Sequence, residues 1–182
     1  MLILLFLAYQ TAAYDCFPTS IWITIRQMGA RVSYAEVLAS APAAEIGYYA
    51  DPTFTQAYGF TSWAGYGTLE TVSAELAEGD PVVWCQNRPA IGHCVVVYGL
   101  DDTSLYIWNP QTGDEVIPLS EMPQYSYPSG YWMVTLDGGA AAEKPEDGSN
   151  RMQKIGRVLI NNLTPSFGAA FCLGYNADSG TK

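Results

Sequence analysis

After residue 80 the chain is a run of short apolar segments separated by turn residues. The segments are PVVWCQ (81–86), GHCVVVYGL (92–100), SLYIWNP (104–110), EVIPL (115–119) and YWMVTL (131–136). They are rich in β-branched and aromatic residues and follow a period of two, which predicts strands. A run of consecutive strands joined by turns, with helices before it, predicts a mostly antiparallel sheet, in which 92–100 and 104–110 are antiparallel neighbours. Any fold of this chain must therefore accommodate a mostly antiparallel sheet.

Helical patterns come before this run. The apolar spacing of three to four residues and the cap signals predict helices over residues 18–28, 33–39 and 68–79. The second opens on the capping box SYAE. Residues 41–67 have no clear period, and we expect a loop-rich stretch there with one helical turn near 52–58. Helices followed by consecutive strands predict an α+β fold.

The length of 182 residues suits one domain with additional segments. We expect the domain to span residues 1–137. Residues 138–150 have no large apolar side chain and are predicted to be a flexible linker, and residues 151–182 a tail with a short amphipathic helix of unknown role. The apolar start MLILLFLAY is too short to span a bilayer and lacks a basic beginning. We expect a buried strand or a packed segment there, not a signal peptide, and no transmembrane segment.

Composition excludes several functions. Eight basic residues against 18 acidic ones give a formal charge of −10, which argues against nucleic acid as a partner because phosphate binding needs clustered cations. One His and four scattered Cys cannot complete the usual zinc ligand sets. We therefore expect no metal and no cofactor. Of the cysteines, Cys85 and Cys94 lie on adjacent predicted strands, and we expect two small buried side chains there, with a cross-strand disulfide as the alternative.

Cys16 lies just before a predicted helix, and Pro18 is a favoured first-turn residue. A helix N-terminus stabilises a thiolate, which is the nucleophilic form of Cys. His93, the only His, begins one predicted strand, and Asn109 ends the next. The DDTS turn between these strands brings His93 and Asn109 to the same end of a hairpin. An imidazole beside Cys16 would take its proton, and the Asn109 oxygen would orient the ring.

The order Gln10, Cys16, His93, Asn109 resembles that of papain-like cysteine peptidases. More narrowly, it is similar to the compact bacterial branch typified by the double-glycine leader peptidase domains of bacteriocin exporters. The matching pieces are YQTAAYDCFPTSIWITIRQMG, TLETVSAELAEGDPVVW, GHCVVVYGLDD and LYIWNPQTGD. The resemblance implies a papain-like fold, in which an N-terminal helical lobe carrying Cys16 faces the antiparallel sheet. It also implies that the Gln10 amide and the Cys16 N–H stabilise the oxyanion.

The chain departs from this branch at two positions. Members commonly have Gly after the nucleophile, where this chain has Phe17, and an acid as third member, where it has Asn109. A large side chain at position 17 would narrow the cleft or cover a subsite. We expect Phe17 to contact substrate. Trp63 and Tyr66 are also expected to contact it, and for these two residues the alternative is packing in the core.

Three functions follow. The first is a cysteine peptidase that cuts a peptide or protein substrate at small-residue or Gly-Gly sites. The chain carries its own LDGGAAA after the domain, so self-processing after Gly139 is a further hypothesis. The second is a hydrolase of cell-wall (murein) peptides, as in a phage lysin module. The third is an inactive papain-like binding module.

Overall fold

Helices and a six-stranded sheet make up the part of the chain that the computed structural model describes, residues 9–88 and 92–138. In chain order the elements are α1 (Cys16–Gln27), α2 (Tyr34–Ser40), the 3-10 helix η1 (Thr53–Tyr58), β1 (Phe60–Gly67), α3 (Leu69–Glu78), β2 (Val82–Gln86), β3 (His93–Leu100), β4 (Ser104–Asn109), β5 (Gly113–Pro118), the 3-10 helix η2 (Leu119–Tyr125) and β6 (Tyr131–Gly138). Of the N-terminal strand or packed segment expected over residues 1–9, residues 1–8 lie outside the described residues. Residues 139–150 of the predicted linker and the whole of the predicted tail, 151–182, also lie outside them.

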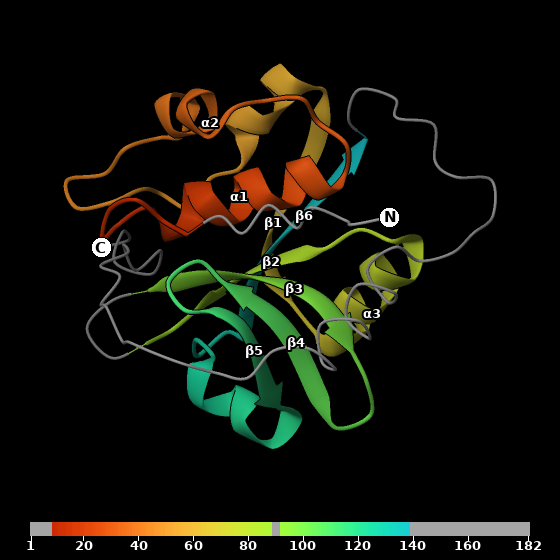
Figure 1. The fold of residues 1–182 in the computed structure, drawn as a ribbon. Coiled ribbons are helices and arrows are strands. Elements are labelled where there is room, and N and C mark those ends of the chain that lie inside the picture. The colour runs from red at the N-terminus through yellow and green to blue at the C-terminus, as the bar shows by residue number, and fades with distance from the viewer. Residues whose placement is uncertain (1–8, 89–91, 139–182) are drawn as a thin grey trace.

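The strands follow the order β1-β6-β2-β3-β4-β5, and every neighbouring pair is antiparallel. The predicted α+β fold with an antiparallel sheet is confirmed. Figure 1 shows α1 and α2 over one face of the sheet and α3 over the other. Val83, Cys85, Cys94 and Val134 pack toward α1, and Trp84, Val95 and Met133 pack in the core on the α3 side. This alternation follows from the two-residue period of a strand.

Local signals place the helix ends. Ser33 caps α2 in a reciprocal capping box with Glu36, and Thr68 caps α3 in the same way with Thr71. Gly79 ends α3 with φ +93°, a left-handed conformation that Gly adopts without steric cost. These predicted ends are confirmed within one or two residues.

β1 was not predicted, because residues 60–67 were expected to be loop. The segment FTSWAGYG contains two glycines and only weak alternation, so it lacks a strand signal of its own. It becomes a strand by pairing with β6 over the full register from Phe60↔Gly138 to Gly67↔Tyr131. The helical turn near residues 52–58 is present as η1.

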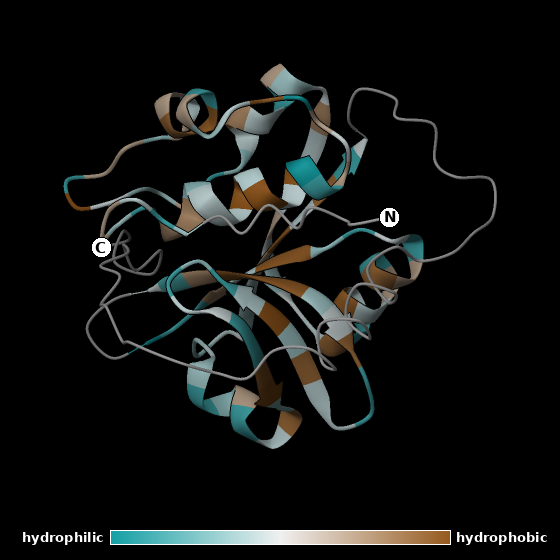
Figure 2. Ribbon diagram, in the orientation of Figure 1, coloured by the Kyte–Doolittle hydropathy of each residue, from teal (hydrophilic) through white to brown (hydrophobic). Residues whose placement is uncertain are grey.

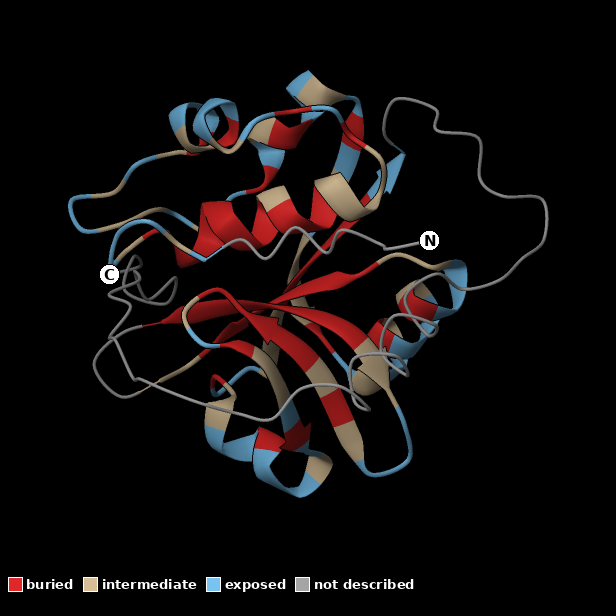
Figure 3. Cartoon of the chain, viewed as in Figure 1, coloured by how far each residue is buried: buried red, intermediate tan, exposed pale blue. Residues whose placement is uncertain are grey.

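The most completely buried strands are the central ones, β2 and β3. β2 is buried along its whole length and β3 along its first six residues. Figures 2 and 3 show the same distribution, with apolar, buried central strands and more polar, exposed residues on the outer side of α3 and at the hairpin turns. Within the described ranges, none of the helices has the length and apolar character that crossing a bilayer requires.

Candidate active site

Cys16 is the first residue of α1 and is 2% exposed. The helix begins there because the Asp15 carbonyl accepts the first helical bond from the Thr19 N–H at 2.9 Å, and Pro18 fits the first turn without needing a donor. The Asp15 side chain does not cap the helix. Cys16 therefore lies at the positive end of the α1 dipole.

The loop before Cys16 is held by a buried carboxylate. Asp15 Oδ2 accepts hydrogen bonds from the Thr11 hydroxyl and the Tyr34 hydroxyl, each at 3.1 Å, and Tyr34 also bonds to Thr19. Burial raises the pKa of Tyr34, which keeps its phenol protonated as a donor. These bonds tie residues 11–15 to α1 and α2 and so fix the approach to the thiol.

His93 begins β3 and is 1% exposed. Its Nε2 lies 2.8 Å from Oδ1 of Asn109, the last residue of β4. The register Val96↔Trp108, continued toward the strand end, places Asn109 opposite Val95, so His93 and Asn109 are diagonal neighbours on one face. The hairpin therefore brings these two side chains together at the end where the sequence predicted their contact.

The Asn109 amide has a defined orientation. Its Oδ1 also accepts from the Gln111 N–H at 3.0 Å, and its Nδ2 donates to Glu115 Oε1 at 2.9 Å. Since Oδ1 only accepts, His93 Nε2 must carry the proton that lies between them. Nδ1 is then the basic atom of the neutral ring, and it has no hydrogen-bond partner among the described residues.

A hydrogen bond connects α1 to the beginning of β3. The Ser20 hydroxyl, one turn after Cys16, donates to the Cys94 carbonyl at 3.0 Å, and both residues are buried. Gly92 and Cys94, the residues on either side of His93, line the same pocket as Cys16. Cys16 and the residues on either side of His93 therefore border one pocket. The His93 side chain is not among the residues that line it and, by the alternation along β3, lies on the Val95 face of the sheet.

Gln10 lies on the segment that crosses the end of the β4–β5 hairpin. Its backbone N–H donates to the Pro110 carbonyl at 3.0 Å, and Tyr9 packs on Trp108 with ring centroids 5.9 Å apart. The side-chain Nε2 donates to the Ala12 carbonyl at 2.8 Å. Gln10 is thus anchored directly beside the residue that follows Asn109.

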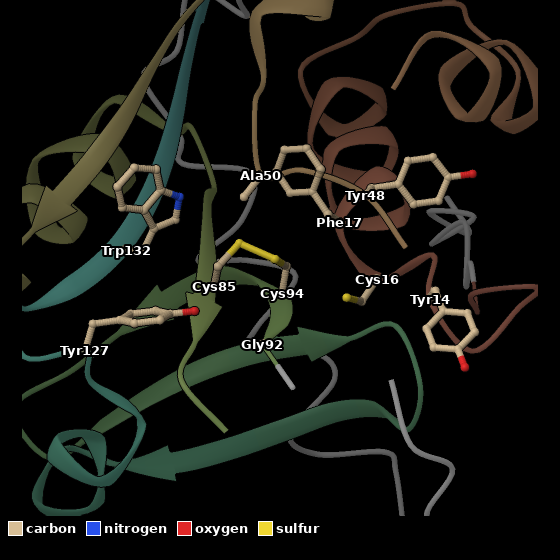
Figure 4. A pocket seen from close by; sticks show the side chains of 10 residues that line it. All are labelled: Tyr14, Cys16, Phe17, Tyr48, Ala50, Cys85, Gly92, Cys94, Tyr127 and Trp132. Carbon is tan, nitrogen blue, oxygen red and sulfur yellow. A yellow bond between two sulfur atoms is a disulfide. The ribbon is translucent and has the colours of Figure 1, made fainter. Parts of the chain in front are cut away.

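The pocket at Cys16 is small. Its volume is about 20 Å³, and a cavity needs about 10–15 Å³ to hold one water molecule. Its walls come from the start of α1 and the residue two before it, the α2–η1 and η2–β6 connections, β2, the start of β3 and β6. The lining residues are Tyr14, Cys16, Phe17, Tyr48, Ala50, Cys85, Gly92, Cys94, Tyr127 and Trp132. Figure 4 shows the Cys16 sulfur directed into this space, on the side that faces the Cys85–Cys94 disulfide.

The three residues predicted to contact substrate lie in different places. Phe17 lines the pocket and is 2% exposed. Tyr66 packs edge-on against two lining residues, Trp132 at 5.2 Å and Tyr127 at 6.3 Å between ring centroids, and is not itself part of the lining. Trp63 is 46% exposed on the edge strand β1 and is not part of this lining.

Cys85 and Cys94 form a disulfide, so the preferred expectation of two unlinked buried side chains was wrong. They are directly paired in the β2–β3 register with Cα atoms 4.0 Å apart, a separation that brings the two sulfurs within bonding reach. The sequence could show adjacency but not redox state. Cys16 is a thiol, outside this disulfide.

Among the described residues, three acidic side chains lie close enough together to hold a cation. They are Glu75, Asp80 and Asp137. Burial and the neighbouring Asp137 and Asp80 charges raise the pKa of Glu75. Asp137 lies at the far end of β6 from Trp132, so this group is separate from the pocket at Cys16.

Sequence reasoning missed Glu115 and most of the aromatic lining. Glu115 could have been found from the hairpin pattern, because β5 pairs Ile107↔Glu115 and Asn109↔Gly113, which puts Glu115 on the Asn109 face. Tyr48 and Tyr127 had no comparable signal, since each reaches the pocket from an irregular connection.

Comparisons with known proteins identify the family and the fold. Residues 6–129 match the model of the Peptidase C39-like family. The peptidase domain of Streptococcus ComA, a bifunctional ABC transporter involved in quorum sensing, has TM-score 0.60 at 16% identity, covering 72% of this chain and 96% of that one. A double-glycine motif protease from an AMS/PCAT transporter, in complex with its leader peptide, has TM-score 0.56 at 19% identity, covering 71% and 89%.

A C39-like peptidase of Bacillus anthracis has TM-score 0.55 at 16% identity, covering 73% of this chain and 94% of its own. No curated protein sequence matches significantly. At these identities the structures establish the shared papain-like fold, and the family model establishes membership. The chain belongs to the Peptidase C39-like family and is a cysteine peptidase.

Proposed function

We propose that this protein hydrolyses peptide bonds through a Cys16–His93–Asn109 triad. His93 Nδ1 takes the thiol proton, and the Cys16 sulfur attacks the peptide carbonyl carbon. The resulting oxyanion is stabilised by the Cys16 N–H and the Gln10 amide. His93 then gives the proton to the leaving amine as the C–N bond breaks, which leaves a thioester. Water, deprotonated by His93, hydrolyses this thioester and returns the thiol.

The state of His93 carries this proposal. Asn109 Oδ1 holds the proton on Nε2 and thereby makes Nδ1 the basic atom. The bases for pairing Nδ1 with Cys16 are the shared pocket of Cys16, Gly92 and Cys94, and the Ser20–Cys94 bond beside it. A thiol at the start of α1 and a buried, oriented imidazole at the start of β3 are the groups that nucleophilic catalysis needs, and the proposal requires that the imidazole reach the thiol.

Gln10 is the proposed oxyanion donor. Its amide Nε2, which donates to the Ala12 carbonyl, is a donor of the type that stabilises an oxyanion. The anchoring of its backbone to Pro110 supports a fixed position for this side chain.

The narrow pocket supports substrates with small residues at the cut, including Gly-Gly. Its aromatic walls, which include Phe17, Tyr48 and Trp132, leave little space beside the sulfur. A Gly residue needs no side-chain pocket, and it lets the substrate backbone approach closely.

Self-processing after Gly139 is proposed only between molecules. Gly138 ends β6, six residues after the pocket residue Trp132. At about 3.3 Å per residue, a strand of this length spans about 20 Å. The LDGG segment of one molecule would therefore have to reach the pocket of another.

The test combines labelling and digestion. A thiol-directed electrophile should label the wild type at Cys16, and the protein should cut an internally quenched peptide with a central Gly-Gly-Ala sequence. Cys16→Ala should lose both properties while keeping its circular dichroism spectrum and melting temperature. Trp63→Ala serves as the matched control and should keep both.

Three outcomes contradict the proposal. Turnover by Cys16→Ala overturns the nucleophile. Clearing of purified cell walls without cleavage of any soluble peptide from a library replaces it with a murein hydrolase. A folded wild type that neither reacts with the electrophile nor cuts either substrate overturns the proposed catalysis.

A further inference from the structure

Glu115 lies behind the proposed triad, on β5, and no step of the proposed reaction uses it. It is half-buried, and its Oε1 accepts hydrogen bonds from Asn109 Nδ2 at 2.9 Å and from the Thr112 hydroxyl. Asn109 itself is 2% exposed. We propose that Glu115 is a positioning residue that holds the Asn109 amide in one orientation, and that its carboxylate is the reason an amide stands at position 109.

The two ends of the Asn109 amide differ in hydrogen bonding but hardly in shape. The oxygen and nitrogen of an Asn side chain have nearly the same shape, so a 180° flip about the terminal bond changes the hydrogen bonds and almost nothing else. An ionised carboxylate only accepts, so Glu115 requires the nitrogen on its side. The Gln111 N–H only donates, so it requires the oxygen on the other side. Asn109 is therefore clamped from both ends.

The clamp extends to His93. With Oδ1 fixed toward the ring, the imidazole must donate through Nε2, and Nδ1 is left as the base. A flipped amide would present an N–H to Nε2 and would favour the opposite tautomer, with the proton on Nδ1. That tautomer cannot take a proton from Cys16 at Nδ1.

The same contact explains the residue type at position 109. An Asp there could accept from His93, but its second oxygen would lie where Nδ2 now lies, 2.9 Å from Glu115 Oε1. Two carboxylates at this distance cannot both be ionised without a large cost, so one would bind a proton. Glu115 and Asn109 therefore form a matched pair, and an acid at position 109 requires a neutral residue at position 115.

A spectroscopic experiment tests the clamp without turnover. The chain has one His, so 15N-histidine labelling gives a single imidazole in a long-range 1H–15N correlation spectrum. In the Cys16→Ala background we expect the Nε2–H tautomer to dominate above neutral pH. Adding Glu115→Ala should lower its fraction measurably, and adding Glu115→Gln should keep it, because the Gln oxygen still accepts from Nδ2. Glu121→Ala, an exposed acid on η2, is the control.

Activity tests the consequence, which rests on the proposed function. With the thiol intact, Glu115→Ala should lower kcat about three- to tenfold with KM nearly unchanged, and Glu115→Gln should stay within about twofold of wild type. Asn109→Asp should lose about tenfold or more, and Asn109→Asp/Glu115→Gln should recover to within about threefold. A purely structural role for Glu115 would not produce this rescue.

The outcomes separate the two proposals. An unchanged tautomer in folded Glu115→Ala overturns the positioning role, whatever the activity. If the tautomer changes as expected but the wild type does not turn over substrate, the positioning role is supported and the triad is overturned. Failure of Glu115→Gln to rescue Asn109→Asp overturns the matched pair.

Discussion

The Ser20 hydroxyl donates a 3.0 Å hydrogen bond to the Cys94 carbonyl, and this bond ties the helix that carries Cys16 to the strand that carries His93. The two residues are 74 positions apart in the chain, and both are buried. The bond lies one helical turn from the sulfur and one residue from the imidazole. The relative position of the Cys16 thiol and the His93 imidazole therefore depends on a contact between two other residues, Ser20 and Cys94.

Ser20→Ala should lower both stability and rate. The Cys94 carbonyl loses a buried donor, which we expect to cost about 1–2 kcal/mol of unfolding free energy. Because the helix start can then shift relative to β3, kcat/KM should fall about fivefold or more. Denaturant unfolding and the Gly-Gly-Ala peptide assay measure the two effects. Ser126→Ala, which removes an exposed bond within its own turn, is the control, and an equal effect in both variants contradicts the prediction.

The Cys85–Cys94 disulfide should stabilise the domain without taking part in the reaction. It closes a loop with a sequence separation of nine residues, for which chain-entropy reasoning gives about 2–3 kcal/mol. Cys85→Ala/Cys94→Ala should therefore melt several degrees lower but keep labelling at Cys16. Dithiothreitol should lower the melting temperature of the wild type and leave that of the double variant unchanged. A double variant that melts like the wild type shows that the bridge does not stabilise the domain.

Replacing Phe17 by Ala should widen the pocket at the expense of stability. The ring is 2% exposed within the core cluster below α1, so the change should cost about 3–5 kcal/mol. The variant should gain relative kcat/KM for peptides with a residue larger than Gly at the cut. Measurement on a matched pair of peptides, Gly-Gly and Leu-Gly, gives the ratio. Trp63→Ala should change the ratio little, because that side chain lies outside the pocket lining.

The β3–β4 turn should make the domain sensitive to acid. Hydrogen bonds from Tyr106, Thr103 and Ser104 lower the pKa of Asp101 to about 2 from 3.8. Because the folded-state pKa is depressed, this contribution is complete above about pH 4 and is lost as pH falls toward 2. Asp101→Ala should therefore melt lower than the wild type at pH 6, and the difference should shrink by pH 2. A difference that is constant across this range contradicts the assignment.

The sequence by itself determined the elements and contacts that depend on near neighbours. The capping box at Ser33 lies within four residues, and a short turn sets the His93–Asn109 hairpin. Such hydrogen bonds form between groups that the chain already holds close together, so residue type and spacing are enough to predict them. The α+β class followed from the same local patterns.

Only the tertiary structure decided the features that join distant segments. β1 is a strand because β6 pairs with it, from Phe60↔Gly138 onward, and the pocket needs Phe17, Tyr48 and Trp132 from three separate segments. The orientation of Asn109 depends on Glu115, whose charge acts only after β4 and β5 have paired. These contacts carry no local signal, because their free energy comes from burial and pairing between parts of the chain that folding brings together.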